Sequence, residues 1–345
     1  MDSKRIKNIR IGIENALKWS LYKHKIFKNC NRKFLFKYLD FFVLKEEKVL
    51  VSFLKKIKFL KHFQGDLVHL FIKIIINNFI NNNSIDFEEI KNKFKIQFWN
   101  NINNSKKITC NNFGNLFDAN FINLYKNNYI WEFFYDYSIT NKELENLYEM
   151  SLTALVNFYQ YFNDNILKAL KNFHILWIDS IGEIKNKDNV NKKYNIIEYN
   201  LKIENGNIKI LLNPDFVIIN EKEKQIFIYD WKTHKKEDLD LNQFKLYTLY
   251  YSNIYNEFNI KNIIVYLFPE LEEQVISIND IQDFIEFIFN SYNEIKNKIK
   301  EAYLELKNHT DINDNDIKKI YEYFPVVDDL SVCSFCEFRK LCFNL

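Results

Sequence analysis

Residues 213–235, NPDFVIINEKEKQIFIYDWKTHK, constrain the fold more than any other stretch of this chain. Two apolar runs, FVII and QIFIY, flank the polar turn NEKEK, a pattern that predicts a β-hairpin buried on both faces. A turn centred at residues 222 and 223 predicts these cross-strand partners: Ile219 with Ile226, Val217 with Ile228, and Asp215 with Asp230. Lys232 projects from the same face as Asp230, because side chains alternate along a strand. The hairpin therefore carries three charges at its open end.

Two facing carboxylates repel each other unless a proton, a cation or a salt bridge offsets their charge. Hard cations such as Mg²⁺ are held by one or two carboxylates together with phosphate oxygens and water. A lysine beside such a metal orients or deprotonates a water, or stabilises charge on a phosphate. The alternative is that Asp215 caps a turn while Asp230 and Lys232 form an ordinary ion pair at a strand end. The hairpin alone leaves both interpretations open.

The rest of the chain divides into a helical part and a sheet part. Helical apolar spacing runs from about residue 45 to 80, and NKELENLYEMSLTALVNFYQYF predicts another helix. From about residue 177, short apolar runs predict strands, with a helix at about 240–256 and two further strands after it. Residues 280–306 predict an amphipathic helix whose apolar stripe is Ile281, Phe284, Ile288, Tyr292, Ile295, Ile299 and Leu306. No repeat or convincing linker divides the chain, so we expect a single domain over residues 1–345.

Composition limits the function only loosely. The chain has 345 residues, 47% of them hydrophobic, and a net charge of +3, which neither requires nor excludes a nucleic-acid partner. The first residues lack an apolar signal core, and HLFIKIIINNFI is too short to span a bilayer and contains Lys73. We therefore expect a cytoplasmic protein with no membrane partner. In that compartment the five cysteines are more often free, metal-bound or redox-active than joined in structural disulfides.

Three motifs occur in the order typical of one enzyme family. Pro214-Asp215, followed after the hairpin by Asp230-Trp231-Lys232, resembles the signature of the PD-(D/E)XK nuclease superfamily. Upstream, GDLVH resembles the family's G-x-x-x-H helix and ends at His69. Downstream, NQFKLYTLYY carries Gln243 and Tyr247, which resemble the Q-x-x-x-Y motif of the RecB-like branch. Taken singly, His69 reads as a core histidine and Gln243 as an exposed residue beside a core tyrosine, but the shared order favours the family.

The resemblance implies a restriction-endonuclease-like α/β fold, with a central mixed β-sheet flanked by helices. The sheet core would occupy residues 177–280, and residues 80–175 would form a helical insertion. Residues 20–70 would hold the N-terminal cysteine and the G-x-x-x-H helix, and residues 281–345 the long helix and the C-terminal cysteines.

It also implies roles for the site residues. His69, Asp215, Asp230 and the backbone carbonyl of Trp231 would bind Mg²⁺ or Mn²⁺. Lys232 would orient or activate the attacking water. Gln243 and Tyr247, one helical turn apart on one face, would position the DNA strand or the lysine.

The C-terminal segment CSFCEFRKLC places Cys333, Cys336 and Cys342 in a C-x2-C-x5-C spacing, which is unusual for free thiols. Cys30, in CNRKF near the start, would complete a four-thiolate site that joins the two ends of the chain. This arrangement resembles the iron–sulfur subset of RecB-like nucleases, the AddB-type and CRISPR adaptation nucleases, although Asn31 replaces their usual proline. The resemblance implies a 4Fe–4S cluster, with zinc as the alternative. Cys110 matches no motif.

The resemblance therefore implies a metal-dependent deoxyribonuclease that acts on single-stranded DNA or DNA ends in repair, recombination or related processing, with exonuclease action expected. The basic and aromatic residues 32–38 would contact phosphates or stack on bases. The alternative is a non-cleaving DNA-end-binding or scaffold subunit of a repair or adaptation complex. Because the sequence contains no G-x-x-x-x-G-K-[ST] loop, a helicase partner would be a separate polypeptide.

Overall fold

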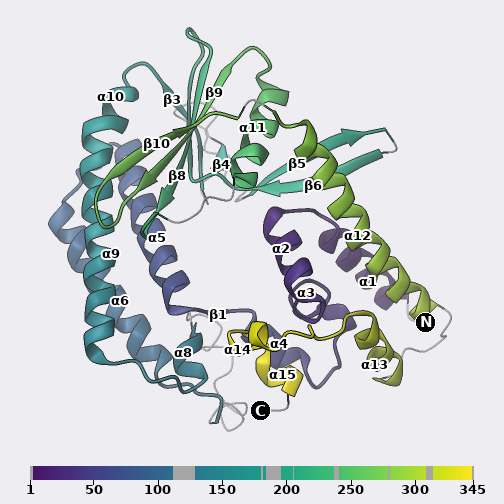
Figure 1. Cartoon of the computed structure of the whole chain (residues 1–345). Coiled ribbons are helices and arrows are strands. Elements are labelled where there is room, and N and C mark those ends of the chain that lie inside the picture. The colour runs from purple at the N-terminus through teal and green to yellow at the C-terminus, as the bar shows by residue number, and fades with distance from the viewer. Residues whose placement is uncertain are drawn as a thin grey trace. The chain divides into compact units, whose positions relative to one another are not determined.

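The chain forms two compact units, which the computed structural model in Figure 1 describes over residues 3–111, 129–179, 182–183, 196–204, 206–236, 241–278, 280–307 and 314–343. Unit 1 comprises Met1–Ile57, Glu198–Leu212 and Asp280–Leu345, and unit 2 comprises Lys58–Ile197 and Asn213–Asn279. Both ends of the chain therefore belong to unit 1, whereas unit 2 is built from the middle of the sequence.

A six-stranded sheet with the order β10-β9-β8-β7-β3-β4 forms the centre of unit 2 (Figure 1). Its strands are β3 (His174–Ile178), β4 (Gly182–Glu183), β7 (Phe216–Asn220), β8 (Gln225–Lys232), β9 (Asn259–Tyr266) and β10 (Glu272–Ile276). β8 and β9 are parallel and are linked through α11 (Asn242–Ile254), and the other neighbouring strands are antiparallel. The expected α/β class with a mixed central sheet flanked by helices is confirmed.

The β7–β8 hairpin has the predicted register, since Val217 pairs with Ile228 and Ile219 with Ile226. Its turn is held by the buried Asn220, whose Oδ1 accepts the backbone N–H groups of residues 222 and 223 at 3.0 and 3.1 Å. An asparagine side chain that captures nearby backbone donors in this way stabilises a tight turn. The turn therefore sets the pairing, and the pairing brings the charges together at the open end.

The two faces of this sheet are covered by different helices. One face packs in a single core with α5 (Leu60–Ile80), α6 (Phe87–Ser105) and α9 (Asn141–Tyr161), and the rings of Phe158 and Trp231 meet there at 5.2 Å. α11 lies against the other face, where the Asn262 amide donates to the Thr248 hydroxyl at 2.9 Å. Because side chains alternate along β8, Trp231 points into the first core and Asp230 points toward α11.

The remaining elements of unit 2 are short. Ahead of α9 lie β2 (Tyr129–Ile130) and α8 (Trp131–Phe134), and α9 begins with a capping box between Thr140 and Glu143. It continues through a π-helical turn, η3 (Phe162–Ile166), into α10 (Leu167–Ala169). β1 (Ile57–Lys58) lies where the sequence passes from unit 1 to unit 2. The described residues between 80 and 175 are thus predominantly helical.

Unit 1 is mainly helical. Its N-terminal helices are α1 (Ser3–Ala16), α2 (Leu21–Asn29), α3 (Asn31–Tyr38), η1 (Asp40–Phe42) and α4 (Lys48–Leu54). Its C-terminal helices are α12 (Gln282–Lys307), α13 (Asp314–Tyr323), α14 (Ser331–Ser334) and α15 (Arg339–Phe343). A two-stranded sheet of β5 (Ile197–Ile203) and β6 (Gly206–Leu212) comes from the middle of the sequence, and Trp19 forms two backbone hydrogen bonds with β6, each 2.7 Å long.

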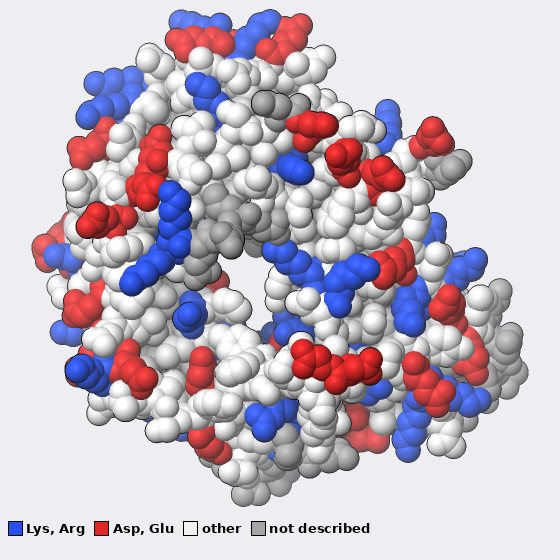
Figure 2. All heavy atoms as spheres, viewed as in Figure 1, with Lys and Arg blue, Asp and Glu red and all other residues white. Residues whose placement is uncertain are grey.

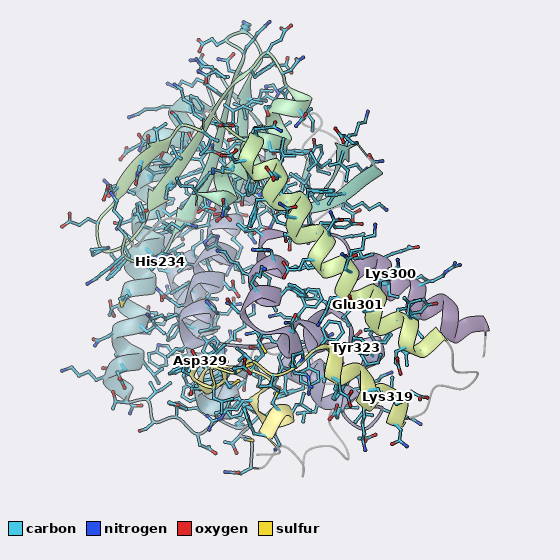
Figure 3. All side chains as sticks on the ribbon, turned by 45° about the vertical axis from the view of Figure 1, so that its right-hand side comes forward. His234, Lys300, Glu301, Lys319, Tyr323 and Asp329 are labelled. Atoms are coloured by element: carbon cyan, nitrogen blue, oxygen red, sulfur yellow. The ribbon has the colours of Figure 1, made fainter. Side chains whose placement is uncertain are left out.

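The long helix α12 buries most of the stripe that its sequence predicts, but Ile281 lies just before the helix and is only half-buried. Its buried residues are Phe284, Ile288, Ser291, Ile295, Ile299, Ala302 and Leu306, while Tyr292 is half-buried. Ser291 is tolerated in the core because its hydroxyl accepts the indole N–H of Trp19 at 2.8 Å. α13 adds polar contacts to α12, where Lys319 lies 3.7 Å and the Tyr323 hydroxyl 3.4 Å from the Glu305 carboxylate (Figure 3).

Among the helices that the structure describes, none combines the length and apolar content needed to cross a bilayer.

Candidate active site

The two predicted carboxylates lie at the open end of the β7–β8 hairpin. Asp215 immediately precedes β7, and its Oδ2 accepts the backbone N–H of Trp231 at 2.8 Å. Asp230 is buried near the end of β8, and its Oδ2 lies 2.5 Å from the Lys232 ammonium. The structure therefore brings Asp215, Asp230 and Lys232 together, and each carboxylate has a donor on at least one of its oxygens.

α11 supplies Gln243 and Tyr247 to the same place. The Gln243 amide donates to Asp230 Oδ1 at 2.7 Å and to the Tyr247 hydroxyl at 2.8 Å. The Tyr247 hydroxyl in turn donates to the backbone carbonyl of Asn213 at 3.0 Å. Gln243 thus orients Asp230, and Tyr247 holds the backbone two residues before Asp215.

α5 supplies His69, whose Nδ1 lies 3.3 Å from Asp215 Oδ1. The apolar face of α5 is buried in the unit 2 core through Phe63, Leu67, Val68 and Phe71. His69 lies on the opposite, more polar side of the helix. This packing places the imidazole beside Asp215, on the side away from Asp230's contact with Gln243.

Gly65, the first residue of the G-x-x-x-H motif, marks a close approach between α5 and the end of β8. A Cβ atom at Gly65 would lie 3.3 Å from the Thr233 hydroxyl oxygen, which is tighter than ordinary van der Waals contact. Thr233 directly follows Lys232 in sequence. The missing side chain therefore lets α5 approach the strand that carries Asp230 and Lys232.

We expect Gly65→Ala to leave stability nearly unchanged, because the helix propensity gained offsets a contact that relaxes by a few tenths of an ångström. Gly65→Val adds two more methyl groups beside the Thr233 hydroxyl and has a lower helix propensity than Gly65→Ala, so it is expected to cost about 1–3 kcal/mol. Thermal unfolding measures both. Thr233→Ala in the Gly65→Val background should recover part of the loss, and a Gly65→Val protein as stable as Gly65→Ala would contradict the packing argument.

The charges of the cluster are strongly coupled, and His69 and Asp215 stabilise each other's charged forms. Burial alone would lower the pKa of His69, but the adjacent Asp215 carboxylate outweighs it and raises the pKa above its usual value, with Asp230 adding to the effect. Burial alone would raise the pKa of Asp215, but His69, the Trp231 N–H and Lys232 together lower it. Asp215 is therefore ionised at neutral pH.

Asp230 and Lys232 form the second pair. Burial and the neighbouring Asp215 charge raise the pKa of Asp230, although Lys232 and His69 oppose the shift. Burial would lower the pKa of Lys232, but Asp230 and Asp215 raise it above its usual value. Two carboxylates whose pKa values are pushed in opposite directions are typical of an acid–base or metal-binding site.

The donor types in the cluster suit a hard divalent cation, because two carboxylates and an imidazole are ligands that Mg²⁺ or Mn²⁺ accept. In the part of the chain that the structure describes, no three or more His, Cys, Asp or Glu side chains are arranged to hold a metal ion together. The oxygens of Asp215 and Asp230 are instead paired with His69, Lys232, Gln243 and the Trp231 N–H.

Three further residues that the sequence motifs do not include surround Asp215: Lys73, Asp179 and Asn213. Lys73 is one turn beyond His69 on α5 and forms an ion pair with Asp179, which follows β3 directly. The Asn213 amide donates to Asp179 at 2.5 Å. The available signal was the acidic residue that ends ILWID, because it places a charge at the end of an apolar strand, as Asp230 does in β8.

The four cysteines of the expected cluster all lie in unit 1. Cys30, Cys333 and Cys336 are buried and Cys342 is half-buried. Burial, and more weakly the other cysteine sulfurs, raise the pKa of Cys333 and of Cys342, the latter to about 12. Burial also raises the pKa of Cys336 to about 12. The sulfurs are thus near enough to influence one another's charge, whereas Cys110 belongs to unit 2.

Residues 32–38, which were expected to contact nucleic acid, use most of their polar groups in contacts within unit 1. The Arg32 guanidinium donates to the carbonyls of Phe324 and Tyr321 at 2.7 and 2.8 Å and stacks on the Tyr321 ring. Lys33 and Lys37 lie 2.6 and 3.2 Å from the buried Glu337 carboxylate. Phe34, Leu35 and Phe36 are buried. This segment ties α3 to the C-terminal segment.

Three polar residues close to the motifs in sequence lie on the surface. Asp66 is exposed and pairs with Lys58. His62 is exposed and packs edge-on against Phe59. His234, labelled in Figure 3, is exposed, and its Nδ1 lies 2.8 Å from the Lys235 carbonyl. None of these three side chains contacts Asp215 or Asp230 in the contacts described above.

No curated protein matches the chain. A family model described as the PD-(D/E)XK nuclease superfamily matches residues 18–343, which is nearly the whole chain. Members of this superfamily are generally nucleases. The chain belongs to the PD-(D/E)XK nuclease superfamily.

Proposed function

We propose that this chain is a Mg²⁺- or Mn²⁺-dependent deoxyribonuclease of the RecB-like branch, which hydrolyses phosphodiester bonds in single-stranded DNA or at DNA ends, as an exonuclease. The observation that carries the proposal is the convergence of His69, Asp215, Asp230, Lys232, Gln243 and Tyr247, from four separate elements, on one end of a buried hairpin. A buried charged cluster of this kind is costly for a purely structural role. Repair, recombination or related DNA processing is the setting that this branch suggests.

Each residue has a role in this proposal. His69, Asp215, Asp230 and the Trp231 carbonyl would hold the metal ion, and when bound it would supply an activated water and offset charge on the phosphate. Gln243 keeps Asp230 in its orientation through the 2.7 Å hydrogen bond, and Tyr247 holds the backbone before Asp215. These contacts limit the movement of both carboxylates when DNA enters.

Lys232 acts as an ammonium ion in this proposal. Its raised pKa, caused by the two nearby carboxylates in spite of burial, keeps it protonated at neutral pH. A protonated lysine donates hydrogen bonds and cannot accept a proton from water. We therefore infer that Lys232 orients the attacking water or stabilises charge on the phosphate, rather than acting as the general base.

Metal affinity is expected to fall as the pH is lowered, because Asp230 and His69 must lose their protons to bind a cation. The pKa of Asp230 is raised by burial and Asp215, and that of His69 is raised by Asp215 against the effect of burial. Mn²⁺ titrations at about pH 8 and about pH 6 should give weaker binding at the lower pH. Each proton that Mn²⁺ must displace lowers the affinity by up to about tenfold for each pH unit. Equal affinity at both values would contradict this ligand assignment.

We further propose that Cys30, Cys333, Cys336 and Cys342 hold a 4Fe–4S cluster, with zinc as the less favoured alternative. Support comes from their membership of one unit, their burial and the spacing of the last three. Four cysteine thiolates are the usual ligands of such a cluster. The cluster would join the two ends of the chain as a structural element without taking part in hydrolysis.

The deciding experiment is cleavage of end-labelled DNA with Mg²⁺ or Mn²⁺. Single- and double-stranded substrates, blocked at the 5′ or the 3′ end, separate exonuclease from endonuclease action and give its polarity. RNA of the same sequence tests the choice of nucleic acid. Binding to DNA ends without cleavage of any substrate would overturn the proposal and favour a scaffold subunit that works with a separate helicase or repair protein.

The surface charges are compatible with a local DNA-binding site and do not indicate a broad one. Figure 2 shows Lys and Arg side chains interspersed with Asp and Glu side chains on the face in view. With a net charge of +3, long-range attraction to DNA is weak. We expect DNA binding to depend on contacts near the site in unit 2. We propose the cytoplasm as the location of the protein.

A further inference from the structure

A half-buried ion pair lies beside the site on the Asp215 side. Lys73 projects from α5 one turn after His69, and its ammonium contacts the Asp179 carboxylate just beyond β3. The two side chains are 22% and 13% exposed, so neither is free in solvent and neither is fully enclosed. The pair therefore links the helix that carries His69 to the end of a central strand.

Asp179 also holds the segment that carries Asp215. Its Oδ1 accepts the Asn213 amide at 2.5 Å, and its backbone N–H donates to the Asp215 carbonyl at 2.9 Å. From the other side, the Tyr247 hydroxyl donates to the Asn213 carbonyl at 3.0 Å. Residues 213–215 are thus held by hydrogen bonds from two directions.

This support matters because Asp215 lies outside the regular ladder of the hairpin, which begins with Phe216 paired to Tyr229. Only the Trp231 N–H and His69 contact its carboxylate directly among the hydrogen bonds and ion pairs described here. The position of Asp215 therefore depends on how the preceding backbone is anchored. In enzymes, a misplacement of about 1 Å can cost about 100-fold in rate.

We propose that Lys73, Asp179 and Asn213 form a positioning network that fixes Asp215 relative to His69. This proposal rests on the proposed function, because positioning Asp215 matters for activity only if Asp215 and His69 bind the metal ion. None of its three residues contacts a reacting atom, so each is a positioning residue. Lys73 acts through Asp179, and Asp179 acts through Asn213 and the Asp215 backbone.

The effect on activity is expected to exceed the effect on stability. A partly exposed ion pair contributes only about 0–1 kcal/mol to folding, so removing it leaves the protein folded. Asp179→Ala is expected to lower kcat by about 10–100-fold with little change in KM for DNA, and to weaken Mn²⁺ binding in the absence of DNA. Lys73→Met should change the same quantities in the same direction by a smaller factor.

The double variant Lys73→Met/Asp179→Ala is expected to be no worse than Asp179→Ala, because both changes act through one carboxylate. A direct role of Lys73 in binding phosphate predicts the opposite: Lys73→Met would raise KM, and the two losses would multiply. Glu257→Ala, which removes an exposed ion pair with Lys224 at the far end of the hairpin, is the matched control and should leave kcat and Mn²⁺ affinity unchanged.

The test separates this proposal from the proposed function. Asp179→Ala with wild-type kcat and Mn²⁺ affinity, alongside an inactive Asp215→Ala, would overturn the network and leave the nuclease assignment in place. If the wild-type chain cleaves nothing, the nuclease assignment fails, and unchanged Mn²⁺ affinity in Asp179→Ala then overturns the network as well. Should Asp179→Ala unfold, Asp179→Asn, which keeps an acceptor for Asn213 but loses the charge, is measured in the same way. If Asp179→Asn and Lys73→Met, measured as separate variants, both keep the wild-type kcat and Mn²⁺ affinity, the network is also overturned.

Discussion

Replacing Lys232 with methionine is expected to lower the rate of metal-dependent DNA cleavage by about 10²–10⁴-fold. Methionine keeps most of the apolar stem but removes the ammonium that lies 2.5 Å from Asp230. The variant should fold, because loss of the lysine charge further favours the protonated, uncharged form of the buried Asp230 carboxyl. Cleavage of end-labelled DNA, with thermal unfolding measured in parallel, tests both statements.

Lys236→Met is the matched control for this change. Lys236 lies four residues further along the chain and is exposed, and it pairs with Glu272 rather than with the site. It should cleave at close to the wild-type rate. Asp215→Asn should be as inactive as Lys232→Met, since it removes the carboxylate that contacts His69 and the Trp231 N–H. A Lys232→Met protein that cleaves within twofold of the wild type would remove the basis for the proposed mechanism.

The second large effect concerns the cysteines of unit 1. Protein purified without oxygen is expected to be brown and to contain about four iron atoms per chain. Cys333→Ser should lose iron and lower the unfolding temperature strongly, because a metal site that binds only the folded state contributes its binding free energy to folding. Iron analysis, the visible absorption spectrum and thermal unfolding provide the measurements.

Cys110→Ser serves as the control, because Cys110 belongs to unit 2 and lies outside the proposed ligand set. It should retain colour, iron and stability. Colourless protein with stoichiometric zinc would replace the iron assignment by zinc. Protein with neither metal, and with Cys333→Ser as stable as the wild type, would show that the four thiols have no shared ligand.

Features set by neighbouring residues could be predicted from the sequence. The β7–β8 register follows from the alternation of apolar residues and from the short turn, and the pairing of Val217 with Ile228 confirms it. The shared face of Gln243 and Tyr247 on α11 follows from helical spacing, since they are one turn apart and hydrogen bonded to each other, whereas their choice as site residues came from the family resemblance. Such patterns need only local geometry, which a single sequence contains.

Features set by distant partners could not be predicted. Arg32 reads as a nucleic-acid contact until the carbonyls of Tyr321 and Phe324, nearly 300 residues away, are seen to accept its hydrogen bonds. Ser291 interrupts an apolar stripe, and its burial is explained by hydrogen bonds with the distant side chains of Trp19 and His24. No sequence motif distinguishes Asp179 from other acidic residues, and its role is indicated only by its contacts with Lys73 and Asn213. In each case the meaning of the residue lies in a contact that sequence spacing does not contain.

The division of the chain also sets the order in which it can fold during synthesis. The segments of unit 2 end at residue 279, so all of them are synthesised before Asp280–Leu345, the segment that completes unit 1. Unit 1 begins with the first residue yet needs Asp280–Leu345 to complete it, and Arg32 cannot reach its carbonyl partners until then. The apolar surfaces of the first helices therefore stay uncovered until the C-terminal segment has been synthesised. A chain cut after residue 279 would therefore contain every segment of unit 2 but only part of unit 1, and would leave the apolar surfaces of the first helices uncovered.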